Sequence, residues 1–291
     1  MKRIALKIDV DTCRGALSGV PALLALLRTH AAQATFFLAL GPDRTGRQAA
    51  AGSLKHHYDL STRLTGSLLP TPDIGRRAAD LVRAARDAGH EVGVHAWDRV
   101  RWEQRIATAD NRWIETEMAL ACARFEEILG ERAQSFAAPG WLTARHALRL
   151  TQRLGFAYAS DCRGDHPFIP VIDGEIVACP QLPTTLPTLD ELLALDAASP
   201  EQAADRILQL SEAIPGDHVF TLRAELEGMK FQAAAERLLA GWRTLGHALV
   251  PLRTLRADLD VATLPRHCLA PATVPGRDGA RMTQGARFLQ N

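Results

Sequence analysis

Short runs of apolar and β-branched residues alternate with longer amphipathic runs along most of the chain. The runs that predict strands cover residues 4–10, 34–40, 91–95, 134–137, 156–160, 176–179 and 219–223. Those that predict helices cover residues 20–30, 74–88, 111–129, 144–154, 203–213 and 232–245. Repeated strand–helix units are typical of a parallel sheet with helices on its faces, and their number here predicts a closed or nearly closed α/β barrel.

The length and composition fit a single domain of this kind. A chain of 291 residues with 47% apolar residues can fill one large core, and α/β barrels commonly reach such a size as one domain. We therefore expect one barrel over residues 1–270. From about residue 271 the sequence is rich in Pro, Gly and Arg, which predicts an irregular or disordered tail over residues 271–291.

Charge and cysteine content narrow the function classes. The 34 basic and 33 acidic residues nearly cancel, so bulk charge does not favour binding to nucleic acid or to an anionic membrane. The five cysteines are scattered without a CxxC pair, which indicates reduced thiols in a cytoplasmic protein.

The N-terminus has no signal-peptide pattern, and no apolar run is long enough to span a bilayer. Leucines at near-helical spacing between residues 60 and 69 would either pack on the barrel or touch the inner face of a membrane.

Three side chains suited to metal or acid–base chemistry stand at predicted strand ends. Asp9 and Asp11 end the first strand and, two residues apart, point to the same side. His95 ends the strand over residues 91–95. Because the reactive residues of a parallel barrel lie at the carboxyl ends of its strands, a shared site there could hold a divalent ion and a water that loses its proton near neutral pH. The alternative is a solvated turn and a hydrogen-bonded structural histidine.

The segments that carry these residues resemble a known family. Residues 8–12 and 89–98 are similar to the first two motifs of the polysaccharide deacetylase family, which shares the NodB homology domain. Further segments resemble one branch of it, the deformylases acting on 4-deoxy-4-formamido-arabinose carried on undecaprenyl phosphate; they lie at residues 14–15, 19–21, 41–43, 138–141, 160–164, 182–188 and 224–228. Each match is short, and the assignment depends on their order and spacing along residues 4–255.

The resemblance implies a fold, a reaction and roles for particular residues. The fold would be a distorted (β/α)7 TIM-like barrel of the polysaccharide deacetylase type. The reaction would remove an N-formyl or N-acetyl group from an amino sugar with water activated by zinc or a similar divalent metal. Asp9 would act as general base, and Asp11 and His95 as metal ligands. Asp161 would be a supporting carboxylate, and Trp141 would line the cleft.

Two positions depart from the family pattern. The second motif normally has another metal-binding histidine four residues after the first, and this chain has Arg99 there. The last motif normally ends its strand on a histidine that protonates the leaving amine, and this chain has Arg223 there. A guanidinium stays protonated at neutral pH, so it neither ligates a metal nor acts as a general acid.

These departures leave two arrangements open. In the first, one of the arginines pairs in bidentate fashion with a strand-end carboxylate and takes the place of the metal. In the second, Asp98 supplies the missing ligand and Glu225 the missing acid, so that hydrolysis survives.

The predicted function divides in the same way. The first prediction is a carbohydrate deformylase or deacetylase acting on an amino sugar or a lipid-linked sugar, such as aminoarabinose on undecaprenyl phosphate. The residues expected to take part in its reaction are Asp9, Asp161 and Arg223. The alternative is a catalytically silent family member that binds a phosphorylated or lipid-linked sugar, or a partner protein, through an Arg–carboxylate cleft. A third possibility is a barrel that serves only in the assembly of a complex, and no feature of the sequence favours it.

Overall fold

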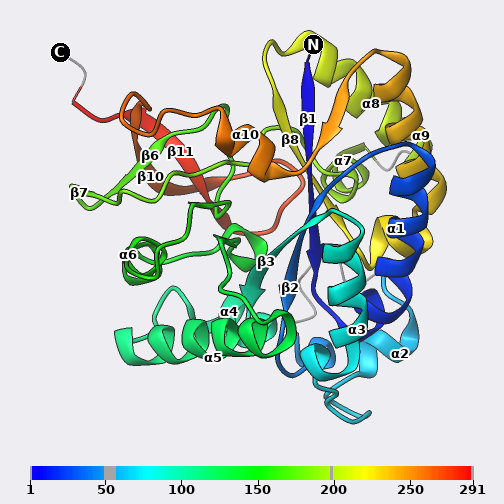
Figure 1. Cartoon of the computed structure of the whole chain (residues 1–291), viewed down its shortest axis with the longest axis horizontal. Coiled ribbons are helices and arrows are strands. Elements are labelled where there is room, and N and C mark those ends of the chain that lie inside the picture. The colour runs from blue at the N-terminus through cyan, green and yellow to red at the C-terminus, as the bar shows by residue number, and fades with distance from the viewer. Residues whose placement is uncertain (1, 49–56, 197–198, 290–291) are drawn as a thin grey trace.

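The computed structural model describes residues 2–48, 57–196 and 199–289, and its centre is a parallel sheet (Figure 1). The hydrogen-bonded order is β5-β4-β3-β2-β1-β8, with β9 paired to β1, and every pairing is parallel. The strands are β1 (Arg3–Val10), β2 (Thr35–Ala39), β3 (Glu91–Ala96), β4 (Ser135–Phe136), β5 (Tyr158–Ala159), β8 (His218–Arg223) and β9 (Ala248–Val250).

An extended segment over residues 180–186 joins the two outer strands. Leu182 N donates to Ala159 O (2.8 Å) beside β5, and Thr185 N donates to Val219 O (3.0 Å) in β8. This segment closes the sheet into a distorted barrel. The predicted parallel α/β barrel is therefore confirmed.

The long helices pack around the outside of the barrel (Figure 1). They are α1 (Val20–Thr29), α3 (Ile74–Asp87), α5 (Asn111–Leu129), α6 (Arg145–Arg153), α8 (Pro200–Ala213) and α9 (Gln232–Thr244), and all were predicted to within three residues. Short helices are α2 (Leu60–Leu64), α4 (Arg99–Arg105), α7 (Leu189–Asp196) and α10 (Leu252–Ala257). Side-chain caps explain several starts, as where Asp110 accepts from Trp113 N (2.8 Å). Within the described ranges, no helix combines the length and hydropathy that crossing a bilayer requires.

Strand β1 separates the apolar core from the barrel interior. Ile4, Leu6 and Ile8 belong to the large core shared with the helices. Ala5 points the other way, into a smaller apolar cluster that includes Leu252 of α10 and fills the amino end of the barrel. Beside this cluster, Glu91 accepts hydrogen bonds from Thr35 Oγ1 (2.6 Å) and Tyr158 Oη (2.9 Å), and the charged groups described below lie toward the carboxyl ends of the strands.

A second sheet corrects two predictions. Strands β6 (Ile169–Ile172), β7 (Glu175–Ile176), β10 (Arg266–Thr273) and β11 (Ala280–Arg287) form it in the order β11-β10-β6-β7, on the left of Figure 1. The strand predicted over residues 176–179 is wrong as a barrel strand, because only Ile176 is in a strand and β7 pairs antiparallel with β6. The irregular tail predicted from residue 271 is also wrong, since β10 and β11 form an antiparallel hairpin. Its Pro and Gly residues lie mostly in the turn between the strands, and its strands are largely exposed, so the composition resembles that of a disordered segment.

Candidate active site

The predicted site residues meet at the carboxyl edge of the barrel. Asp9 of β1 is in register with Arg223 of β8, and Asp11 follows directly after β1. His95 lies in β3, and Asp161 follows β5. All five side chains are buried, with relative exposures of 3% or less.

Asp11 is the centre of the charge cluster. Arg223 Nη1 lies 3.3 Å from Asp11 Oδ2, and Arg99 Nε lies 3.7 Å from Asp11 Oδ1. Each arginine reaches the carboxylate with one nitrogen, so the bidentate pair expected from the sequence does not form. His95 Nε2 lies 3.2 Å from Asp11 Oδ1. Burial alone would raise the pKa of Asp11, but the charge of Arg99, with smaller effects of His95 and Arg223, lowers it well below its usual range.

The residues present do not fit a divalent metal. Two guanidinium groups face Asp11, the carboxylate that would be a metal ligand. Their positive charge would repel a divalent cation bound to the same carboxylate. The described ranges contain no group of three or more His, Cys, Asp or Glu side chains placed to hold an ion. Asp98, the substitute ligand, is occupied elsewhere: its Oδ2 pairs with Arg44 and its Oδ1 accepts from Arg101 N (3.0 Å) at the start of α4.

Glu225 is fixed beside Asp11 by the backbone after β1. Its Oε1 accepts from Asp11 N (2.9 Å), Thr12 N (2.8 Å) and Thr12 Oγ1 (3.0 Å). A Cβ at Gly15 would lie 1.9 Å from this oxygen, so the close approach needs glycine there. Burial and the charge of Asp11 raise the pKa of Glu225 to about 8. This shift favours the protonated form of Glu225 near neutral pH.

Asp161 is held by hydrogen bonds on both oxygens. Its Oδ1 accepts from Ala138 N (2.8 Å) and its Oδ2 accepts from Gln181 Nε2 (3.0 Å). Burial raises its pKa to about 6, although the hydrogen bonds from Gln181 and Ala138 oppose that rise. The carboxyl group thus has a fixed orientation at the edge of the cluster.

Trp141 stacks with four cationic groups. The distances to its ring centroid are 5.1 Å for Arg163 and Arg277, 5.5 Å for Lys7 and 5.7 Å for Arg223. Its φ of +54° lies in the left-handed region that residues other than glycine rarely adopt. Such strain at a buried tryptophan is typical of a functional site.

Sequence reasoning missed two of these cations. Lys7 is fully buried, and its Nζ lies 3.4 Å from Asp9 Oδ1. The period-two spacing of Lys7, Asp9 and Asp11 could have shown that it shares their face. Arg277 pairs with Asp190 Oδ2 (2.7 Å) and Glu191 Oε1 (2.9 Å), but it stands in the turn of the hairpin that was taken as a tail, so no signal pointed to it.

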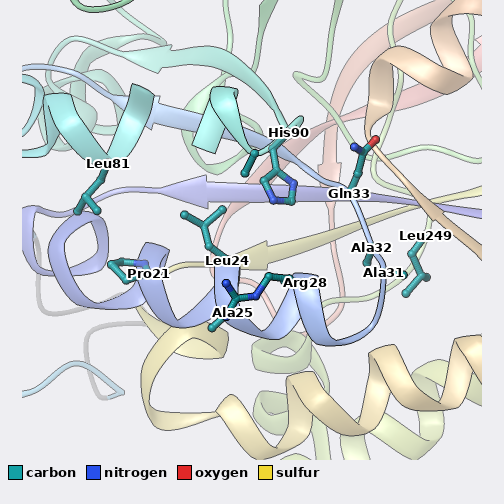
Figure 2. A pocket seen from close by; sticks show the side chains of 11 residues that line it. Pro21, Leu24, Ala25, Arg28, Ala31, Ala32, Gln33, Leu81, His90 and Leu249 are labelled. Carbon is teal, nitrogen blue, oxygen red and sulfur yellow. The ribbon is translucent and has the colours of Figure 1, made fainter. Parts of the chain in front are cut away.

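Two cavities differ in their relation to the cluster. The larger, of about 870 Å³, lies at the amino edge of the sheet, where Gln33 precedes β2 and His90 precedes β3, with Leu24 and Arg28 of α1 beside them (Figure 2). It is therefore remote from Asp11. The smaller, of about 300 Å³, is lined by His57, Tyr58, Asp59, Thr62, Glu225, Met229 and Lys230. Through Glu225 this second cavity adjoins the charge cluster.

Glu117 of α5 supports the end of β3 and makes folding depend on pH. Its side chain is 4% exposed and accepts from Asp98 N (3.1 Å), and burial raises its pKa from 4.5 to about 7. A carboxyl whose pKa is higher in the folded state stabilises the fold fully below its unfolded pKa and loses that contribution as pH rises through its folded pKa. We expect the unfolding free energy to fall between pH 4.5 and about 7, by on the order of 3 kcal/mol for this group.

Glu117→Gln tests this expectation, because the amide cannot titrate. Urea unfolding of the variant should show a flatter pH profile over that interval, whereas Glu126→Gln, at an exposed position of the same helix, should keep the native profile. Parallel profiles for the native protein and Glu117→Gln would show that another group carries the dependence.

Comparison with known proteins adds a family and a fold. The sequence model of the family described as polysaccharide deacetylase matches residues 2–159. A relative from Shewanella sediminis, named "Probable 4-deoxy-4-formamido-L-arabinose-phosphoundecaprenol deformylase ArnD", is 32% identical over 95% of this chain and 93% of its own length. A relative of the same name from Wigglesworthia glossinidia brevipalpis is 29% identical over 91% of this chain and 96% of its own length.

Solved structures share the fold at low identity. A structure described as a "probable Polysaccharide deacetylase" from Pseudomonas aeruginosa is similar with a TM-score of 0.63 and 16% identity, covering 88% of this chain and 90% of that one. A carbohydrate esterase family 4 pseudoenzyme from Bacillus anthracis is similar with a TM-score of 0.55 and 14% identity, covering 88% of this chain and 65% of that one. At such identities the likeness shows a shared fold.

Proposed function

The chain belongs to the polysaccharide deacetylase family, and on this basis we propose that it binds an N-acylated amino sugar at the carboxyl edge of its barrel without hydrolysing it through a metal-bound water. The observation that carries the proposal is the placement of two guanidinium groups on Asp11, at 3.3 and 3.7 Å. An arginine pair on this carboxylate competes with a divalent ion for the same oxygens. The same pair offers positive charge to a phosphate or carboxylate of a ligand.

The class of ligand follows from the relatives and from the smaller cavity. The relatives are named for a formamido sugar on a lipid phosphate. A volume of about 300 Å³ is at the lower end of the range usual for small-ligand sites. Tyr58 Oη and Glu225 Oε2 are buried there without a hydrogen-bond partner among the described residues. Because Oε1 of Glu225 already accepts three hydrogen bonds, the acid proton belongs on Oε2, where it can be donated to a sugar hydroxyl or an amide oxygen.

Exposed leucines beside this cavity support a lipid-linked ligand. Helix α2 follows Tyr58 directly, and the exposures of Leu60, Leu68 and Leu69 are 67%, 81% and 43%. Apolar side chains in such a cluster can enter the headgroup region of a membrane. We therefore also propose that the protein is cytoplasmic and makes peripheral contact with the inner face of the membrane.

Hydrolysis is the second candidate, and one specific observation favours it. Asp9, Asp161 and His95 stand together at the carboxyl edge, as the deformylase-like motifs imply. Among the described residues, the ion-pair partner of Asp9 is Lys7 (3.4 Å), and neither arginine pairs with Asp9, so it keeps the place that the resemblance gives to the general base. For a metal to be held as well, Arg99 and Arg223 would have to leave Asp11.

Three measurements on one preparation of the full chain distinguish the silent binding protein from the hydrolase. They are the metal content, the binding of two sugar probes and the release of amine from those probes. The probes are 4-deoxy-4-formamido-L-arabinose 1-phosphate and N-acetylglucosamine. We expect calorimetry to detect binding of at least one probe, with no divalent ion bound at Asp11 and no amine release above the buffer background. Tyr58→Phe removes one hydroxyl from the cavity and should weaken binding up to about tenfold. Turnover with a bound metal in the native protein would overturn the silent function and establish the hydrolase.

A further inference from the structure

Two histidines outside the candidate active site face each other across the second sheet. His166 stands in the segment between β5 and β6, and His267 lies in β10. Their Nε2 atoms are 3.3 Å apart, and the rings meet edge to face with centroids 5.0 Å apart. His166 is exposed and His267 is partly exposed, so the pair lies at the protein surface.

The neighbours of both rings decide where their protons lie. His267 Nδ1 is 2.8 Å from Gly285 O, and a carbonyl only accepts, so this nitrogen carries the hydrogen. Gln284 Oε1 accepts from Asp165 N (2.8 Å), which leaves the Gln284 amide nitrogen to donate to His166 Nε2 at 3.0 Å. In the neutral state the lone pair of His267 Nε2 faces His166, whereas the single lone pair of His166 Nε2 accepts from Gln284. A cation bound to both nitrogens would displace this hydrogen bond from Gln284.

We propose that His166 and His267 form a binding site for a zinc-type divalent transition metal, with water completing the coordination. Two imidazole nitrogens bound to a tetrahedral zinc ion at about 2.0–2.1 Å lie about 3.3–3.4 Å apart, which agrees with the observed separation. The hydrogen bond from His267 Nδ1 to Gly285 O is the outer contact that orients metal-binding histidines. Only two protein ligands are present in the described ranges, so the affinity should be moderate and should follow copper above zinc.

Metal binding here would act on the candidate active site through the hairpin. His166 is three residues from Arg163, and the strand of His267 leads to the turn that carries Arg277. The guanidinium groups of Arg163 and Arg277 both stack on Trp141. An ion joining the two histidines would tie these segments together, so it should stabilise the hairpin over the charge cluster.

Calorimetric titration of the full chain with zinc chloride tests the site. We expect about one ion per chain in the native protein, at least about tenfold weaker binding in His166→Gln and in His267→Gln, and native binding in His146→Gln. His146 is a suitable control because it lies in α6, where its Nε2 is 2.8 Å from Glu115 Oε1 of α5. Zinc should also raise the thermal unfolding temperature of the native protein and of the control only.

Either of two results would overturn the site. The first is no zinc binding by the native protein. In that case the two rings would be joined by a shared proton and not by a metal ion. The second is unchanged binding in both histidine variants, which would place the ion elsewhere. Equal unfolding temperatures without zinc would show that the variants are folded, and neither result bears on sugar binding at the barrel edge.

Discussion

The double variant Arg99→His with Arg223→His is expected to bind a divalent metal and to release amine from a formamido sugar phosphate. The substitutions remove both guanidinium groups from Asp11 and place an imidazole four residues after His95. Two histidines and one carboxylate are a common ligand set for catalytic zinc, with water in the remaining position. We expect about one more ion per chain than in the native protein by elemental analysis, and amine release at least about 100-fold above that of the native protein, as restored acid–base catalysis allows.

Three controls keep this result interpretable. Each single variant should fall short of the double, because one arginine still faces Asp11. Arg237→His changes an exposed arginine that pairs with Asp205, and it should bind no more metal than the native protein. Circular dichroism and thermal unfolding verify that the double variant is folded. A folded double variant without metal or turnover would show that the two arginines are not what prevents hydrolysis.

The barrel was predictable because its signals are local. The alternation along β1 separates Ile4, Leu6 and Ile8 from Lys7 and Asp9, and this period is visible in the sequence alone. Helix ends were also predictable, since Asp110 and Gly130 mark the limits of α5 in sequence as in structure. The meeting of strand-end residues followed from the geometry of parallel barrels.

Other features depend on contacts between distant segments. The ion pair of Asp98 with Arg44 removes Asp98 from the cluster, and nothing in the sequence near Asp98 announces it. The hairpin of β10 and β11 gains its order by pairing with β6, about a hundred residues earlier, so its exposed strands gave no local signal. Arg277 reached Trp141 only as a result of that pairing. The composition of a segment indicates how much apolar surface the segment can bury by itself. It does not show whether a distant part of the chain provides a strand for it to pair with.

Arg223→Met is expected to lower the unfolding free energy by about 3 kcal/mol or more, because it leaves buried carboxylates without a counter-charge. Arg223 is 3% exposed and lies 3.3 Å from Asp11 and 4.0 Å from Asp190. Burial by itself would lower the pKa of Arg223, but Asp190 and Asp11 together raise it, so the charge is held firmly in the folded state. Methionine fills a similar volume without charge, and urea unfolding measures the difference.

The matched control is Arg237→Met, which breaks an arginine–aspartate ion pair at the surface. Arg237 Nε lies 2.6 Å from Asp205, with about half of each side chain exposed, and such pairs contribute at most about 1 kcal/mol. Adding Asp11→Asn to Arg223→Met removes the unpaired charge as well, so this double variant should recover part of the loss. Equal losses for Arg223→Met and Arg237→Met, or no recovery in the double variant, would mean that the cluster does not depend on Arg223 for its charge balance. A large loss with recovery would show that the guanidinium has become a structural part of the barrel, which explains why a metal cannot simply displace it.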